Sequence, residues 1–291
     1  MRRSSIPSAH KSSANSVRRA LTSAAAIAAA MLVTGCGANP RDATAAPEPE
    51  LTHVHGVVTD PAGDGFLVAT HAGIIPATAE GAIGARIGPG FDAMGLTLAG
   101  DTLLASGHPG EDTPAELGTP HLGIIQSTTR AMSWTPVTFT NEKDFHVLAG
   151  TPWGVVYGIA TDGPDLLISK DNGHTWEPAG ATLPAYNLVV DATKRVIAST
   201  ENGLQTSTDS GATFTNWANT PTIALLNNSP DHEQIVGVDT EGTVWVTTAG
   251  ATGWDKAGST SLSVQAVAIT NDGDVVTVDQ TGVTSLTTAR P

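Results

Sequence analysis

Short apolar runs recur along the chain from about residue 51 onward, and Gly, Pro, Asn and Asp residues separate them. Runs such as GFLVATH, WGVVYGIA and YNLVVD are too short for typical helices, and β-branched residues are frequent in them. This pattern is typical of strands, and the intervening residues are those that form tight turns. We therefore predict an all-β domain that consists of many short antiparallel strands.

An eight-residue pattern, S-x-D-x-G-x-T followed by an aromatic residue, occurs as SKDNGHTW and again as STDSGATF. The Asp carboxylate can accept hydrogen bonds from backbone N–H groups of its own turn, and the Gly tolerates a positive φ angle. The aromatic residue then returns the chain to a strand. Each copy is predicted to close a β-hairpin through Ser169, Asp171, Gly173, Thr175 and Trp176 in the first copy and Ser207, Asp209, Gly211, Thr213 and Phe214 in the second.

Weaker copies of this pattern begin at Ser127 and Thr247, so the four starts lie 42, 38 and 40 residues apart. A period of about 40 residues with several short strands in each unit indicates the blades of a β-propeller. The sequence contains six such units. The first five are each predicted to have four strands, with ARIGP as the fourth in the first unit, and the last has only three clear strands. We expect a six-bladed β-propeller over residues 51–291, with seven blades as the alternative. Residues just before His53 are expected to supply the missing outer strand and close the ring.

The amino-terminal segment has the composition of an export signal. Residues 1–36 contain five basic and no acidic residues, and the apolar run from Ala24 to Val33 is too short to span a bilayer. The segment ends in VTGC, which resembles the lipobox of bacterial lipoproteins, and Cys36 is the only cysteine. We predict a signal peptide over 1–35, lipidation of Cys36, and a flexible tether over 36–50. The expected location is extracytoplasmic, with the lipid anchor holding the protein at the cell membrane.

The chain is strongly acidic. It contains 28 Asp and Glu against 14 Lys and Arg, which gives a formal net charge of −14. Such an excess of negative charge disfavours nucleic acid as a partner, because binding to phosphate requires clustered basic side chains. The acidic surface alone defines no specific site.

Histidines concentrate at one predicted end of three neighbouring units. In an antiparallel meander the first strand starts at the end where the second strand turns into the third. His53, His55 and His146 lie near starts of first strands, and His71 and His108 follow second strands. His53 and His55 are two residues apart, which places their Cα atoms about 7 Å apart on one side of a strand. The pair is predicted to chelate one metal ion that histidines of the other units complete.

Copper and zinc are the metals that this residue set favours. Imidazoles bind zinc and copper, and the nearby thioether of Met94 would favour copper. Asp92 and Asp144 are expected to hydrogen-bond the ligating imidazoles from behind. The alternative is that these histidines line the channel and only hydrogen-bond water and backbone.

The segments HVHG, ATHAG, DAMG, ASGHPG and DFH, together with the octapeptides and the lipobox-like segment, resemble bacterial BNR-repeat lipoproteins commonly labelled glycosyl hydrolase or exo-sialidase. The octapeptide itself resembles the Asp box of this group, which includes sialidases, sortilin-type domains and the photosystem II assembly factor. The resemblance covers about residues 51–291 and implies a propeller. Its label implies a glycosidase.

Sialidase activity is not expected, because the arginines are in the wrong places. Sialidases hold their substrate with three arginines and use a Tyr paired with a Glu, whereas Arg86, Arg130 and Arg195 do not lie at starts of first strands. Tyr186 does lie at such a start, but no arginine cluster faces it.

Two alternatives to metal binding follow from the resemblance. A different glycoside hydrolase would need two opposed carboxyl groups, and the acids predicted on the histidine face are Asp92, Asp144, Asp162, Glu201 and Glu241. No catalytic residue is assigned among them. The other alternative is a scaffold that binds a glycan or an envelope protein.

Overall fold

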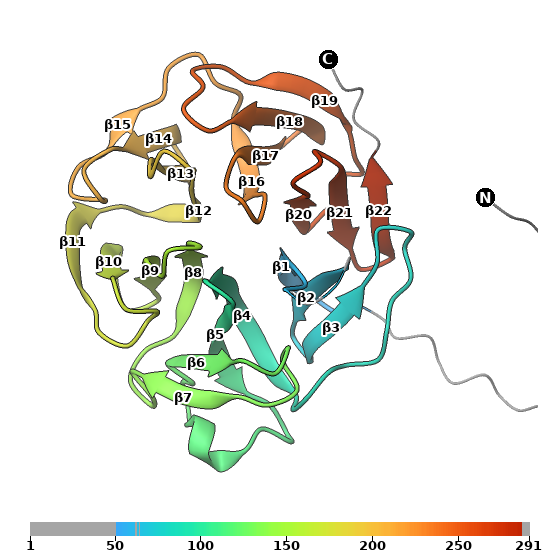
Figure 1. The fold of residues 1–291 in the computed structure, drawn as a ribbon, viewed down its shortest axis with the longest axis vertical. Coiled ribbons are helices and arrows are strands. Elements are labelled where there is room, and N and C mark those ends of the chain that lie inside the picture. The colour runs from blue at the N-terminus through green and yellow to red at the C-terminus, as the bar shows by residue number, and fades with distance from the viewer. Residues whose placement is uncertain (1–50, 62, 64, 287–291) are drawn as a thin grey trace, which may run out of the picture. The chain divides into compact units, whose positions relative to one another are not determined.

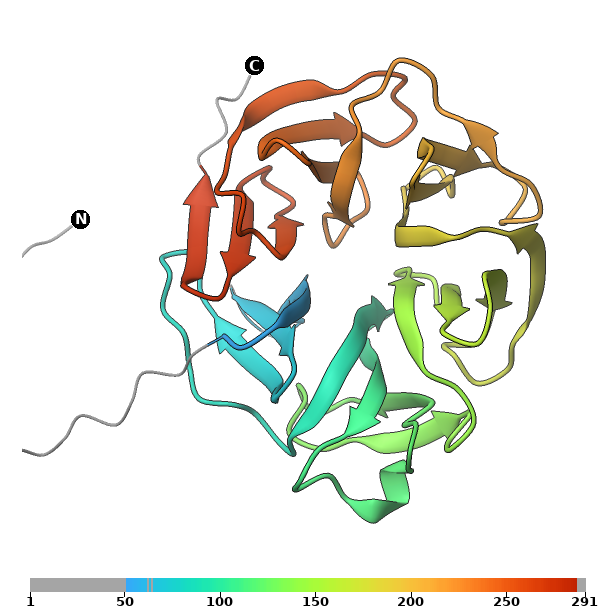
Figure 2. The ribbon, with the colours of Figure 1, turned by 180° about the vertical axis from the view of Figure 1, so that it is seen from behind.

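The structure is a computed structural model that describes residues 51–61, 63 and 65–286. The predicted signal peptide, lipidated cysteine and tether lie outside these residues. The described residues form six antiparallel sheets arranged in a ring, with the first strand of each sheet nearest the axis (Figures 1 and 2). The prediction of a six-bladed β-propeller is confirmed.

The second to fifth sheets each contain four strands in sequence order. Their strands are β4 (Phe91–Ala99), β5 (Thr102–Pro109), β6 (Ile124–Ser127) and β7 (Thr135–Thr138); β8 (Phe145–Gly150), β9 (Val156–Ala160), β10 (Asp165–Ser169) and β11 (Glu177–Thr182); β12 (Ala185–Val190), β13 (Val196–Thr200), β14 (Gly203–Ser207) and β15 (Thr215–Asn216); and β16 (Ile223–Asn228), β17 (Gln234–Asp239), β18 (Thr243–Thr248) and β19 (Asp255–Ser259). A 3-10 helix, η1 (Ala115–Leu117), lies in the β5–β6 connection.

The first and sixth sheets contain three strands each among the described residues. They are β1 (Val54–Thr59), β2 (Phe66–Thr70) and β3 (Gly73–Ala77), and β20 (Ala266–Ile269), β21 (Val275–Asp279) and β22 (Gly282–Leu286). The sequence predicted a fourth strand in the first blade, and this prediction is wrong. The segment after β3 forms only isolated bridges, Ile74 with Ile87 and Ala77 with Ile83. Pro76 lies between them in β3 and has no N–H to donate to a continuous ladder.

The closure between the first and last blades relies on side-chain packing in the part of the chain that the structure describes. Leu51 and Thr52 form no strand, so the predicted outer strand for the sixth blade does not form within the described residues. Leu51 is instead buried in an apolar cluster shared by the first and sixth blades, together with Val54, Phe66 and Val276. The side-chain oxygen of Gln265, next to β20, also accepts a 3.0 Å hydrogen bond from the Val54 N–H in β1.

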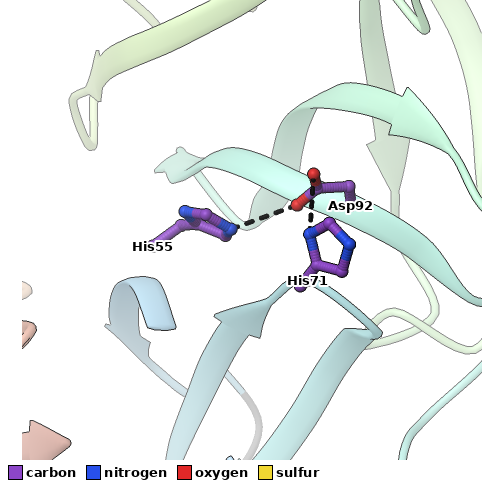
Figure 3. A group of neighbouring side chains, drawn as sticks. All are labelled: His55, His71 and Asp92. Carbon is purple, nitrogen blue, oxygen red and sulfur yellow. Dashed lines mark ion pairs between the residues drawn. The ribbon is translucent and has the colours of Figure 1, made fainter. Parts of the chain in front are cut away.

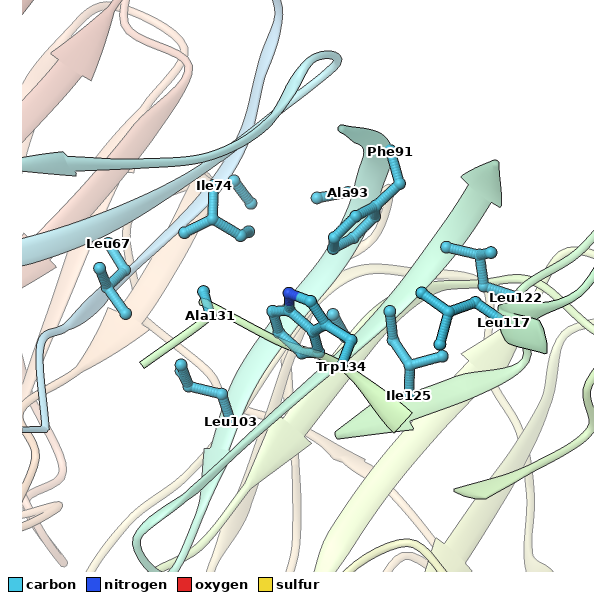
Figure 4. Close-up of a cluster of buried hydrophobic side chains, with 12 residues drawn as sticks. Leu67, Ile74, Phe91, Ala93, Leu103, Leu117, Leu122, Ile125, Ala131 and Trp134 are labelled. Carbon is cyan, nitrogen blue, oxygen red and sulfur yellow. The ribbon is translucent and has the colours of Figure 1, made fainter. Parts of the chain in front are cut away.

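The described core consists of six apolar clusters, one between each pair of neighbouring blades. Figure 4 shows the cluster between the first and second blades, where Trp134 packs among side chains from both. Its indole meets the Phe91 ring edge-on at 5.4 Å between centroids. Because both faces of a middle strand are covered, β2, β9 and β13 are buried along their full length. This explains why these runs are apolar without alternation.

The octapeptide turns connect the third and outer strands of their blades. Asp171 accepts hydrogen bonds from the N–H and the hydroxyl of Thr175, at 2.8 and 2.7 Å. The Ser169 hydroxyl donates to the same carboxylate at 2.8 Å and accepts from the Gly173 N–H at 2.9 Å. Asp209 repeats this arrangement with its own Ser and Thr. Gly173 has a φ of 83°, where a residue with a Cβ is disfavoured.

The weaker copy at Ser127 keeps the turn without the aspartate. The Thr129 hydroxyl accepts from the Ser133 N–H at 2.9 Å, and the Ser127 hydroxyl accepts from the Ala131 N–H at the same distance. A hydroxyl therefore replaces the carboxylate at this position. No helix among the described residues is long and apolar enough to cross a membrane.

Candidate metal site

Bulges in the innermost strands present three of the predicted metal ligands, His55, Met94 and His146. In five of the six blades the pairing between the first two strands shifts register near the start of the first strand. The unpaired residues at these shifts are His55, Met94, His146, Tyr186 and Ala224. A bulge re-aims one side chain away from the regular ladder. The first four of these residues line one cavity at the channel mouth.

The first candidate cluster lies between the first and second blades and consists of His55, His71 and Asp92. Figure 3 shows both imidazoles turned toward the Asp92 carboxylate. His55 Nε2 lies 3.1 Å from Asp92 Oδ1, and His71 Nδ1 lies 3.0 Å from Oδ2. The backbone N–H of His71 donates to the carbonyl of His53 at 3.1 Å, which fixes the turn that carries the His71 ring.

The His55–Asp92 contact is close but does not have hydrogen-bond geometry. Both His55 Nε2 and Asp92 Oδ1 are buried atoms that make no hydrogen bond. Burial lowers the pKa of His55, the Asp92 carboxylate acts in the opposite direction, and the imidazoles of His71, His53 and His146 add to the lowering. The lowered pKa favours the neutral imidazole, which is the form that coordinates metals.

The second candidate cluster lies between the second and third blades and consists of His108, Asp144 and His146. One carboxylate oxygen, Asp144 Oδ2, lies 3.2 Å from His108 Nε2 and 2.6 Å from His146 Nε2. The Asp144 side chain is only 2% exposed. Its interaction with the His146 ring raises the pKa of His146, although partial burial acts in the opposite direction.

Contacts between the two blades hold this cluster in register. The Phe145 N–H in β8 donates to the Ser106 hydroxyl in β5 at 2.9 Å, and both residues are buried. Ser106 lies two residues before His108, and Phe145 lies between Asp144 and His146. The same bond therefore sets the position of all three members of the second cluster.

The inserted loop between β5 and β6 contributes a further imidazole. The His121 ring centroid lies 5.4 Å from that of His108, and its buried Nδ1 makes no hydrogen bond. In addition, His108 Nδ1 donates to the Pro120 carbonyl at 3.3 Å. This bond orients the ring so that Nε2 faces Asp144, in the way that a backbone carbonyl orients metal-ligating histidines.

The sequence predicted a single set of metal ligands, whereas the structure places most of them in two separate clusters. Asp92 and Asp144 lie within the clusters, where each can itself coordinate an ion, in addition to the outer role expected from the sequence. Met94 lines the cavity shared with His55 and His146. His53 belongs to neither cluster; it precedes β1, has a φ of 45°, and its ring lies 6.2 Å from that of His71.

Sequence reasoning gave Tyr186 no role in metal binding, although it occupies the same bulge position as His55 and His146. Its side chain is exposed at the channel mouth. Aligning the first strands of the blades by their bulges would have placed Tyr186 at the same position as His55 and His146. The positions of the bulges are known only from the structure. The other acids considered for a glycosidase show no shared contact. Asp162 forms an ion pair with Lys143, and Glu201 and Glu241 are exposed.

The other two described histidines lie elsewhere. His174 is exposed in the first octapeptide turn, where its Nδ1 contacts the Asp171 carbonyl at 2.8 Å. His232 lies in the β16–β17 turn and is buried against the Val190 carbonyl. Burial lowers the pKa of His232, and the hydrogen bond to Val190 acts in the opposite direction.

Comparison with known proteins shows the fold. No protein-family model and no curated protein matches the chain. Among solved structures, it is similar to a protein named only provisionally as a gluconolactonase, with 12% identity and a TM-score of 0.62 over 82% of this chain and 89% of the other. It is also similar to a GH74 enzyme of Niastella koreensis, with 17% identity and a TM-score of 0.54 over 79% of this chain and 35% of that one.

A third similar structure is YCF48 bound to a D1 peptide, with 9% identity and a TM-score of 0.50 over 83% of this chain and 95% of the other. The chain spans about a third of the length of the first solved structures that it matches, an ancestral GH74 enzyme and an extracellular domain from B. thetaiotaomicron. At these identities the likeness describes the propeller fold and leaves the activity to be argued from the site.

Proposed function

We propose that this propeller binds a divalent transition-metal ion, zinc or copper, at the channel mouth through His55, His71 and Asp92. The observation that carries the proposal is the pair of buried atoms His55 Nε2 and Asp92 Oδ1, which lie 3.1 Å apart with no hydrogen bond to either. Leaving a buried polar atom without a partner is costly, so such pairs are rare unless something lies between them.

The distances from the two imidazole nitrogens to the two carboxylate oxygens of Asp92 support the same proposal. Two ligand atoms about 2.0–2.1 Å from a tetrahedral zinc ion lie about 3.3 Å from each other. The two contacts to Asp92 are 3.1 and 3.0 Å. Met94 lines the same cavity, and a thioether close to imidazoles would favour copper over zinc.

Metal content measured by mass spectrometry after incubation with Zn²⁺ or Cu²⁺ and desalting tests this function. We expect the variant His55→Ala/His71→Ala to lose one equivalent of metal relative to the unaltered protein. His174→Ala is the matched control, because it removes an exposed imidazole from a distant turn and should retain all of the metal. Unchanged metal content in the double variant, with an unchanged melting temperature, would refute the proposal.

We propose that the protein is anchored by lipid outside the cytoplasm and handles metal at the cell envelope, as the predicted lipidation of Cys36 implies.

A glycoside hydrolase has less support, because imidazoles flank both Asp92 and Asp144, and Lys143 pairs with Asp162. Turnover of chromogenic glycosides would favour the hydrolase, and capture of a defined envelope protein would favour a scaffold.

A further inference from the structure

The contacts within the cluster of His108, Asp144 and His146 call for a positive charge between the imidazoles and the carboxylate. The Pro120 carbonyl can only accept a hydrogen bond, so His108 Nδ1 must carry the proton of that bond. A neutral His108 then presents the lone pair of Nε2 to Asp144 Oδ2, 3.2 Å away. Two lone pairs that face each other at this distance repel unless a positive charge lies between them, which is either a second proton on the imidazole or a metal ion.

The environment of Asp144 strengthens this requirement. Its side chain is 2% exposed, and its second oxygen, Oδ1, is buried without a hydrogen-bond partner. Burial of a carboxylate is expensive unless a cation or several hydrogen bonds compensate for the lost hydration. The basic groups of the cluster itself are the imidazoles of His108 and His146, which both contact Oδ2 and leave Oδ1 unsatisfied.

We infer that His108, Asp144 and His146 form a second, independent metal site, so that the propeller binds two divalent transition-metal ions. This inference rests on the proposed function for the kind of ion and goes beyond it in number and location. The ligand atoms of this cluster lie within 4.8 Å of one another, as do those of the first cluster, and the two clusters share no residue. The imidazole of His121, whose Nδ1 makes no hydrogen bond, lies beside this cluster with its ring centroid 5.4 Å from that of His108.

The two sites differ in how their carboxylates are shielded. In the first cluster His71 is 67% exposed and Asp92 is 16% exposed, whereas Asp144 in the second cluster is nearly inaccessible. The inserted loop also holds His108 through the Pro120 carbonyl. The imidazoles of His108 and His146 are 39% and 41% exposed, so burial in this cluster is confined to its carboxylate. A buried carboxylate and a ligand held in its binding orientation before the metal arrives both favour tighter binding and slower release. The second site should therefore retain its ion when a chelator removes the ion from the first.

Titration of five proteins with Co²⁺ or Zn²⁺ separates the possibilities. We expect two equivalents for the unaltered protein, one for His55→Ala/His71→Ala, one for His108→Ala/His146→Ala, and none for the quadruple variant. Asp144→Asn preserves the side-chain shape and should also remove one equivalent, and Co²⁺ absorption reports the site that remains. A melting curve for each variant confirms folding.

The failure of this inference is distinguishable from the failure of the proposed function. One equivalent in the unaltered protein, lost in the first double variant and kept in the second, would overturn the second site and leave the first intact. Loss of all metal in either double variant would mean one shared site, which also overturns the inference. Two equivalents that persist in His108→Ala/His146→Ala would show that the second ion binds elsewhere, which overturns the inference.

Discussion

Gly107 links the two candidate metal clusters, and replacing it tests whether backbone geometry sets both. It lies opposite Ala93, so that the neighbouring cross-strand pair is Asp92 and His108, one member of each cluster. Gly107 has a φ of 148°, and an added Cβ would lie 1.8 Å from the Asp92 carbonyl oxygen and 3.0 Å from the Met94 nitrogen. No flexible side chain is present there to move aside. The β4 and β5 backbones would have to separate.

The cost of Gly107→Ala has two parts. Holding a residue with a Cβ in a disfavoured backbone conformation costs about 1–3 kcal/mol, and forcing extra volume into a packed region costs about 1–3 kcal/mol more. The expected loss in the free energy of unfolding is therefore about 2–6 kcal/mol. Gly203→Ala is the matched control, because Gly203 has a φ of 92° and nothing lies within 4 Å of an added Cβ. Only the strain of about 1–3 kcal/mol applies there.

Urea unfolding followed by tryptophan fluorescence measures both costs, and metal titration measures the effect on the site. Gly107→Ala should weaken binding of both metal equivalents although every ligand is present, whereas Gly203→Ala should leave binding unchanged. Equal destabilisation by the two substitutions, or full metal binding by Gly107→Ala, would refute the idea that the tight β4–β5 approach holds Asp92 and His108 in place.

Two other predictions concern stability away from the site. Arg195→Met removes the guanidinium that donates to the fully buried Asp191 at 2.9 Å, so it should lower the free energy of unfolding by about 3–5 kcal/mol in urea; a loss below about 1 kcal/mol would contradict this. Hydrogen bonds from the following Thr hold the pKa of Asp171 and of Asp209 at about 2, below the ordinary value of 3.8. Their stabilisation is therefore present above pH 3.8 and is lost as the pH falls towards about 2, so the stability gap between the unaltered protein and Asp171→Ala/Asp209→Ala should close over that range. A gap that stays constant from pH 7 to the acid range would show that the carboxylates do not act through their charge.

The fold could be predicted from the sequence because its determinants are local. The hydrogen bonds of the turns at Asp171 and Asp209 join residues at most four positions apart, and the repeat of about 40 residues counts the blades. The sequence did not reveal that the first blade lacks a fourth strand. Pro76 prevents this strand only because the outer edge of β3 would need a backbone N–H at that position to pair with it. Short-range patterns identify strands better than they identify which strands pair.

The candidate site could be predicted only in part, because it depends on register and on contacts between blades. The histidine-rich end of the propeller follows from strand order, but the expectation that His53 and His55 act together assumes a regular strand. The chain is instead left-handed at His53 and bulged at His55. The division into two clusters follows from the blade interfaces that bring His55 and Asp92 together, and no spacing in the sequence reveals these.

The recurrent bulge has a consequence for how such a ring can change during evolution. In five of the six innermost strands the bulged residue makes no ladder pair, and in four of them it lines the cavity at the mouth. A substitution at such a position alters the chemistry of the mouth. The residues that pair on either side of the bulge, and those that form the apolar clusters between blades, stay the same. His55, Met94, His146 and Tyr186 thus form a small set of positions that can vary without changing a ladder pair. A new ligand preference can arise from one or two changes among them.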